Sequence, residues 1–228
     1  MNPPESLLQV FERTLAPDER ERAARFYFDR DRRKFTAARG QLRMILGRYT
    51  GADPTALVFS YGPRGKPALS GQFQPANLKF NLSHSGELAL LAVTLDREVG
   101  VDIEDIHTLN DAEAIAERLF SPNETSVFRA LPEPERLEGF FRCWTCKEAY
   151  VKATGDGLSR PTESFDVVFT RGERTRLVSV DGEPDEAVRW RMAALEPATG
   201  YIGAIAVEGE GWSLTCWRWN QRGHECER

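Results

Sequence analysis

The segment from Phe140 to Pro161 carries side chains suited to chemistry on a charged substrate. Trp144, Glu148 and Lys152 are four residues apart, so a helix through them places an aromatic ring, a carboxylate and an ammonium group along one side. The glycine-rich sequence after Thr154 predicts the end of that helix. The same pattern also fits a surface ion pair between Glu148 and Lys152, worth about 0.3–0.5 kcal/mol.

A second acidic pair lies upstream, in the sequence GVDIED. Asp102 and Glu104 alternate with Val101 and Ile103, which is the pattern of a strand with one acidic face. Three carboxylates from two elements would then be available, and Glu148 is the third. Hard oxygen ligands of this kind suit Mg²⁺ or Mn²⁺, with waters and substrate phosphates completing the shell. Each acid taken singly also fits an ordinary solvated position.

Composition and charge narrow the class of protein. The chain has 228 residues, of which 41% are hydrophobic and 29% charged, as in soluble folded proteins. No apolar run approaches the roughly 20 residues that span a bilayer, and the N-terminus lacks a signal-peptide pattern. We therefore predict a cytoplasmic protein without membrane contact. The net charge of −5 argues against nucleic acid as a partner.

The four cysteines give no disulfide framework and no zinc pattern. Cys143 and Cys146 form a CxxC inside the predicted helix, which favours helix packing over redox or metal chemistry. The tail with His224 and Cys226 is interpreted as a solvated end. Basic residues are concentrated between Asp18 and Arg48, a segment that contains ten Arg or Lys and five Asp or Glu. That segment is either a solvated helical surface or an anion site.

The order of expected elements predicts an α+β fold. Helical patterning begins after Pro17 and stops at Gly51, and a turn at Lys66 follows between two short strands. Strands then alternate with turns up to the acidic strand, with His84 at a strand end. A capping box at Ser121 opens the next helical part, and further strands follow residue 165. We predict two pseudo-symmetric lobes, residues 1–105 and 106–228, each a helix packed on a mostly antiparallel sheet, with the active site between them.

These motifs together resemble a known family. GVDIED paired with FRCWTCKEAYVKATGDGLSRP, with GKPAL and FNLSHSG upstream, resembles the 4′-phosphopantetheinyl transferases of the larger, surfactin-synthetase-activating (Sfp) type. The resemblance covers about residues 15–165. It implies transfer of the phosphopantetheine arm of coenzyme A to a serine of an apo acyl, peptidyl or aryl carrier protein, releasing adenosine 3′,5′-bisphosphate. It also implies a monomer that uses Mg²⁺, with Mn²⁺ as an alternative.

The resemblance assigns roles to the acidic motifs. Asp102, Glu104 and Glu148 match the metal-binding acids of the family, and Asp102 also matches a coenzyme A contact. Lys152 matches the lysine that contacts the phosphates and stabilises the leaving group. Glu148 is a candidate base for the serine proton, and transfer through a water is an equal alternative. Glu148 and Lys152 are thus the predicted catalytic residues.

The remaining predicted contacts concern coenzyme A. Ser83 and His84 match a phosphate-contacting pair, although a histidine at a strand end is more often a local hydrogen-bonding residue. Lys66 matches a contact near the adenine. Trp144 either holds the helix or lines the pantetheine channel. In the basic segment, Arg22 and, as a second candidate, Arg39 match the 3′-phosphate contacts, while Glu19 stands where some relatives carry a lysine.

Two other functions compete with this interpretation. The same acids serve magnesium-dependent phosphohydrolases and nucleases, in which water is the nucleophile. A non-catalytic module that binds carrier proteins would keep the fold but lose the acids. The fatty-acid, polyketide and nonribosomal-peptide pathways remain equal candidates as the source of the carrier.

Overall fold

The structure is a computed structural model that describes residues 3–71, 73, 75, 77–219 and 225–226. The predicted solvated end at His224 lies outside the described residues. The chain divides into two compact units. The first unit comprises residues 1–60, 68–78 and 212–228, and the second comprises residues 61–67 and 79–211. The predicted lobes, which divide at residue 105 on grounds of pseudo-symmetry, stay a prediction.

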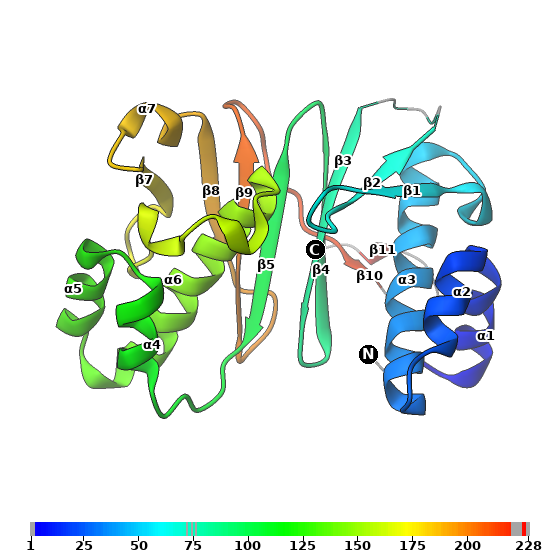
Figure 1. Ribbon diagram of the computed structural model, residues 1–228, viewed down its shortest axis with the longest axis horizontal. Helices are drawn as coiled ribbons and strands as arrows, with labels where there is room; N and C mark the ends of the chain where they lie inside the picture. Colours follow the sequence, from blue (N-terminus) through cyan, green and yellow to red (C-terminus); the bar gives the residue numbers. More distant parts are fainter. Residues whose placement is uncertain (1–2, 72, 74, 76, 220–224, 227–228) are drawn as a thin grey trace. The chain divides into compact units, whose positions relative to one another are not determined.

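The first unit is built on one long helix. Its helices are α1 (Glu5–Thr14), α2 (Pro17–Ala24) and α3 (Asp29–Thr50), followed by the short η1 (Pro54–Ala56). α1 lies beside α3 (Figure 1), and a small cluster that contains Phe11 packs between them. A Cβ atom on Gly40 would lie 2.3 Å from the Cβ of Phe11, so the glycine lets the two helices touch. α3 ends as predicted at Gly51, whose φ of 65° favours glycine.

Two short sheets involve the ends of this unit. β1 (Val58–Tyr61) pairs with β2 (Pro67–Ser70), and β10 (Arg218–Trp219) pairs with β11 (Glu225–Cys226). The predicted turn at Lys66 lies between β1 and β2. The sequence interpretation did not include α1, and it expected helical patterning between Pro17 and Gly51, where α2 and α3 lie.

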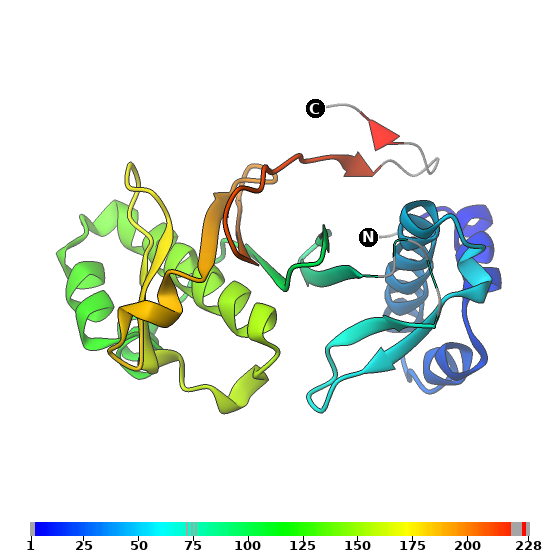
Figure 2. The same ribbon diagram turned by 90° about the horizontal axis from the view of Figure 1, so that it is seen from above.

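The second unit centres on a three-stranded antiparallel sheet in the order β5-β9-β8. These strands are β5 (Val99–Asp105), β8 (Trp190–Leu195) and β9 (Tyr201–Glu208). The helix α6 (Glu133–Thr154) packs against β5 and β9. It lies beside this sheet in both Figure 1 and Figure 2. A two-stranded sheet of β3 (Leu78–Ser85) and β4 (Leu88–Leu95) precedes β5.

Smaller elements complete the unit. They are α4 (Ala112–Leu119), α5 (Pro122–Ala130), η2 (Gly157–Ser159), η3 (Thr162–Ser164), β6 (Phe165–Val168), β7 (Arg176–Val180) and α7 (Pro184–Ala187). β6 and β7 form an antiparallel pair.

α5 begins with the predicted capping box, in which Ser121 Oγ accepts a hydrogen bond from the Glu124 amide and Glu124 Oε2 accepts one from the Ser121 amide. No helix in the described ranges is long and apolar enough to cross a bilayer.

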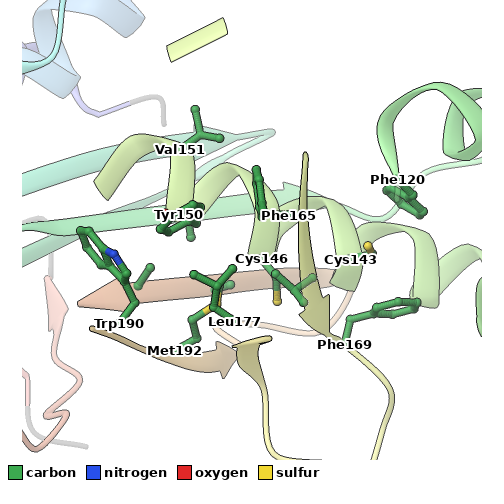
Figure 3. Packing of buried hydrophobic residues seen from close by; sticks show 14 of the residues in the cluster. Phe120, Cys143, Cys146, Tyr150, Val151, Phe165, Phe169, Leu177, Trp190 and Met192 are labelled. Atoms are coloured by element: carbon green, nitrogen blue, oxygen red, sulfur yellow. The ribbon is translucent and has the colours of Figure 1, made fainter. Parts of the chain in front are cut away.

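One side of α6 forms the hydrophobic core (Figure 3). The ring of Tyr150 lies 4.9 Å from that of Phe165 and 5.4 Å from that of Trp190, measured between centroids. Cys143 and Cys146 are free thiols buried in the same cluster, and burial raises the pKa of Cys146 to about 12. The prediction that this CxxC serves packing is confirmed.

Gly100 explains how closely α6 approaches β5. A Cβ atom at this position would lie 2.0 Å from the carbonyl oxygen of Ala149 and 2.3 Å from the amide nitrogen of Ala153. Any side chain there would push the helix away from the strand. The glycine of GVDIED therefore sets the distance between the strand that carries Asp102 and the helix that carries Glu148.

A buried ion pair lies on the same side of α6 as the core residues Cys143 and Tyr150. Lys147 is fully buried, and its Nζ lies 2.7 Å from Glu124 Oε2. Lys147 also donates to the carbonyl oxygens of Thr162 at 2.7 Å and Phe165 at 2.6 Å. Glu124 Oε1 in turn accepts a hydrogen bond from the amide of Val167 at 2.7 Å. Both charges are thus fully coordinated, which is what a buried pair requires.

Candidate functional site

Asp102 lies at the centre of a polar cluster in the second unit. Its side chain is 4% exposed, and Oδ1 accepts hydrogen bonds from Lys152 Nζ at 2.6 Å and from Ser83 Oγ at 2.8 Å. Lys152 Nζ also donates to Ser83 Oγ at 3.0 Å. The other carboxylate oxygen, Oδ2, is buried and has no hydrogen-bond partner in the described part of the chain. An unpaired buried anionic oxygen is costly unless a cation or donor meets it.

Glu104 follows Asp102 by two residues on β5, so the strand's alternation places both acids on one face. Its Oε2 accepts a hydrogen bond from Ser85 Oγ at 2.8 Å. The two acids are therefore each bound by a serine of β3. This pairing of serines with acids has no counterpart in the sequence pattern, because β3 and β5 meet only through the tertiary fold.

Glu148 lies one helical turn before Lys152 and is half-buried on α6. Burial raises its pKa above the usual value, and the negative charges of Asp102 and Glu104 act in the same direction, against Lys152. Burial likewise raises the pKa of Asp102, opposed by Lys152. The three acids are therefore close enough to interact electrostatically.

The carboxylates are nonetheless not gathered around a single point. Among the residues that the structure describes, no three His, Cys, Asp or Glu side chains form a ready metal cluster. Asp102 is instead paired with the ammonium group of Lys152. The residues still fit a divalent cation by their chemistry. They supply hard oxygen donors, and the buried Oδ2 of Asp102 lacks a partner. Their assignment as metal ligands stays a prediction.

Lys66 is anchored within the second unit. Its Nζ donates to the carbonyl oxygen of Ala153 at 2.9 Å, to that of Val99 at 3.2 Å and to Glu98 Oε2 at 3.3 Å. Burial lowers its pKa, against the influence of Glu98. These bonds hold the turn between β1 and β2 at the start of β5 and the end of α6. The predicted contact of Lys66 with coenzyme A would have to compete with them.

Ser83 and His84 do not share a face of β3. Ser83 is buried and points to Asp102 and Lys152, whereas His84 is exposed, as alternation along a strand requires.

Trp144 is half-buried and packs against the core cluster around Tyr150, which supports its role in holding the helix.

The basic residues of the first unit differ in their surroundings. Arg22 lies on α2 with its guanidinium carbon 5.3 Å from the ring centroid of Phe35, and it makes no ion pair with any described residue. Arg39 lies 2.6 Å from Glu19 Oε1 and 4.7 Å from the ring centroid of Phe59. Burial lowers the pKa of Arg39, opposed by Glu19.

Glu19 is therefore a structural counter-ion. It is 3% exposed, and besides Arg39 it binds Arg43 Nε at 2.6 Å. Arg43 itself is buried and donates to the carbonyl oxygens of Pro54 and Leu57 at 2.8 and 2.9 Å. The acid at position 19, which departs from the lysine of some relatives, closes this network. The sequence gives no signal for it, because the partners lie on different helices.

Comparison with known proteins agrees with this arrangement. The family described as 4′-phosphopantetheinyl transferase superfamily matches residues 98–206, and the family described as 4′-phosphopantetheinyl transferase, N-terminal, matches residues 2–96. The chain belongs to the 4′-phosphopantetheinyl transferase superfamily. The predicted family and the α+β fold class are thereby confirmed.

Individual relatives extend over most of the chain. 4′-Phosphopantetheinyl transferase HetI of Nostoc sp. is 43% identical over 219 residues, which are 96% of this chain and 89% of the relative. 4′-Phosphopantetheinyl transferase Sfp of Bacillus subtilis is 31% identical over 193 residues, 85% of this chain and 82% of the relative. The similarity to Sfp supports the predicted Sfp type.

Proposed function

We propose that this chain transfers the 4′-phosphopantetheine group of coenzyme A to a serine of an apo acyl, peptidyl or aryl carrier protein, releasing adenosine 3′,5′-bisphosphate. The cluster of Asp102, Glu104, Glu148 and Lys152, with one buried oxygen of Asp102 unpaired, is the observation that carries the proposal. Family membership supplies the substrates. The nucleophile comes from the partner, so the chain needs no activated serine or cysteine of its own.

Asp102, Glu104 and Glu148 would hold the divalent cation. A bound Mg²⁺ or Mn²⁺ supplies charge neutralisation for the diphosphate of coenzyme A. The orphaned Oδ2 of Asp102 fits this role, because a cation would satisfy it.

The chain's own residues handle the proton and the departing phosphate. The serine oxygen of the carrier forms a bond to the phosphorus attached to pantetheine. The bond from that phosphorus to the bridging oxygen breaks, and its electron pair leaves with adenosine 3′,5′-bisphosphate. Lys152 stabilises that charge through its ammonium group. Glu148 accepts the serine proton, directly or through a water. Burial raises the pKa of its carboxyl group, which makes the carboxylate a stronger base.

The direct test is transfer to a carrier. We expect the protein with coenzyme A, Mg²⁺ and an apo carrier protein to add one phosphopantetheine to the carrier, seen as a mass gain in mass spectrometry. EDTA should abolish the gain, and added Mg²⁺ or Mn²⁺ should restore it. Cleavage of coenzyme A without modification of the carrier would instead identify a phosphohydrolase. An unmodified carrier with intact coenzyme A would point to a binding module.

Arg22 is proposed to bind the 3′-phosphate of coenzyme A. We expect Arg22→Ala to weaken binding of coenzyme A by about 10- to 100-fold, since a hydrogen bond to a charged group contributes about 1.5–3 kcal/mol. Binding of 3′-dephospho-coenzyme A should change little. Isothermal titration calorimetry on both ligands measures the difference. Arg25→Ala, which removes an exposed partner of Glu21 on the next turn, is the control, and equal losses for both ligands would remove Arg22 from this role.

The other predicted contacts with coenzyme A, by Arg39, Lys66, Ser83, His84, Asp102, Trp144 and Lys152, stay predictions. So do the monomeric state and the cytoplasmic location.

A further inference from the structure

One face of β3 carries polar side chains that contact β5. Asn81, Ser83 and Ser85 occupy alternate positions, so they point to the same side of the strand. Asn81 Oδ1 accepts a hydrogen bond from the amide of Val101 at 2.8 Å. Ser83 binds Asp102. These bonds tie β3 to β5 through side chains.

Ser85 is the third of these residues, and its hydrogen bonds have a fixed direction. Its Oγ accepts a hydrogen bond from the amide of Asp105 at 3.0 Å. The single hydroxyl proton is therefore directed to Glu104 Oε2, 2.8 Å away. This arrangement makes Glu104 Oε2 the acceptor and leaves the other oxygen, Oε1, available to a ligand.

Glu104 depends on this serine more than Asp102 depends on Ser83. Asp102 has the ammonium group of Lys152 at 2.6 Å. No lysine or arginine lies within ion-pair distance of Glu104 in the ranges that the structure describes. Without the hydroxyl of Ser85, the glutamate side chain would keep no hydrogen bond to hold its rotamer.

The position of Ser85 is itself held by the neighbouring turn. Tyr201 Oη accepts a hydrogen bond from the amide of Glu87 at 3.2 Å. A Cβ atom on Gly86, whose φ is 53°, would lie 2.6 Å from the same Oη. Tyr201 pairs with Asp105 in the β5–β9 register. The turn after Ser85 is therefore fastened to the same end of the sheet as Glu104.

We propose that Ser85 is a positioning residue that orients the Glu104 carboxylate toward the divalent cation. This inference rests on the proposed function, because it assumes that Glu104 is a metal ligand. Hydrogen-bond partners that orient a metal-binding side chain typically contribute 10- to 100-fold in metal affinity or activity. The effect of removing Ser85 should therefore appear in metal binding first, and in coenzyme A binding without metal hardly at all.

The test measures Mn²⁺ binding by electron paramagnetic resonance titration, in the presence of saturating coenzyme A. We expect Ser85→Ala to raise the Mn²⁺ dissociation constant by about tenfold or more, and Ser85→Cys, a weak donor, to behave similarly. Ser85→Thr keeps the hydroxyl and should restore affinity to within about threefold. Coenzyme A binding in EDTA should be equal in all four proteins.

The matched control is Thr94→Val, which removes a hydroxyl bonded to the Arg97 carbonyl at 2.7 Å in the same pair of strands, away from the acids. It should leave Mn²⁺ affinity unchanged. A Ser85→Ala protein that binds Mn²⁺ as tightly as Thr94→Val would overturn the inference. So would a Ser85→Thr protein as weak as Ser85→Ala, or a wild-type protein that transfers phosphopantetheine without binding Mn²⁺. A wild-type protein that transfers nothing would instead defeat the proposed function itself.

Discussion

Glu148→Gln is expected to lower kcat for phosphopantetheine transfer by about 10²- to 10⁴-fold, the range that general base catalysis contributes. Glutamine keeps the shape of the side chain but cannot accept the serine proton, and it is a weaker ligand for a cation. Coenzyme A should still bind, within about tenfold of wild type, because its other contacts remain. Rapid-quench measurement of carrier modification gives the rate, and calorimetry gives the binding constant.

The control for this variant is Glu135→Gln on the same helix. Glu135 is exposed in the first turn of α6, far along the helix from Lys152, and its replacement should leave kcat unchanged. Near-normal turnover by Glu148→Gln at saturating Mg²⁺ would exclude Glu148 as the base.

Lys147→Met is expected to lower the free energy of unfolding by about 3–5 kcal/mol, as is typical when one partner of a buried ion pair is removed. The variant leaves the carboxylate of Glu124 buried without its cation, although two backbone amides still bind it. The double variant Glu124→Gln/Lys147→Met should recover part of the loss, because no buried charge remains. Urea denaturation followed by circular dichroism measures each difference.

The comparison for Lys147 is an exposed lysine. Lys79 lies 2.8 Å from Glu98 Oε1 with 45% of its side chain exposed, and Lys79→Met should change stability by less than about 1 kcal/mol. A loss for Lys147→Met no larger than that of Lys79→Met would show that the buried pair does not hold α6 in place.

Local sequence patterns predicted the elements that carry the site. The strand of alternating acids and the helix through Glu148 are present as predicted, and the helix ends at Gly155 with a φ of 77°. These features depend on residues a few positions apart, so the sequence reports them directly. α1 was not predicted, although its buried residues Leu8 and Phe11 are spaced as on one face of a helix.

The polar partners of the site could not be predicted in the same way. Ser85 and Glu104 are 19 residues apart, and Glu19 and Arg43 are 24 apart. No local periodicity connects such pairs. Adjacency in sequence also does not place Ser83 and His84 on the same face, because neighbours on a strand point to opposite faces. The family resemblance supplied roles for residues, whereas the structure supplied the bonds that hold them.

α6 supplies residues both to the hydrophobic core and to the polar cluster, and this limits which changes of sequence the helix can accept. The helix contributes Tyr150 and the two buried cysteines to the core. From another face of the same turns it contributes Glu148 and Lys152 to the polar cluster. A shift of the helix that retuned the chemistry would simultaneously open the core, so selection acts on both at once. Adaptation to new carrier proteins is therefore expected to proceed through exposed surface residues, while the helix and its glycine contact at Gly100 change little over evolutionary time.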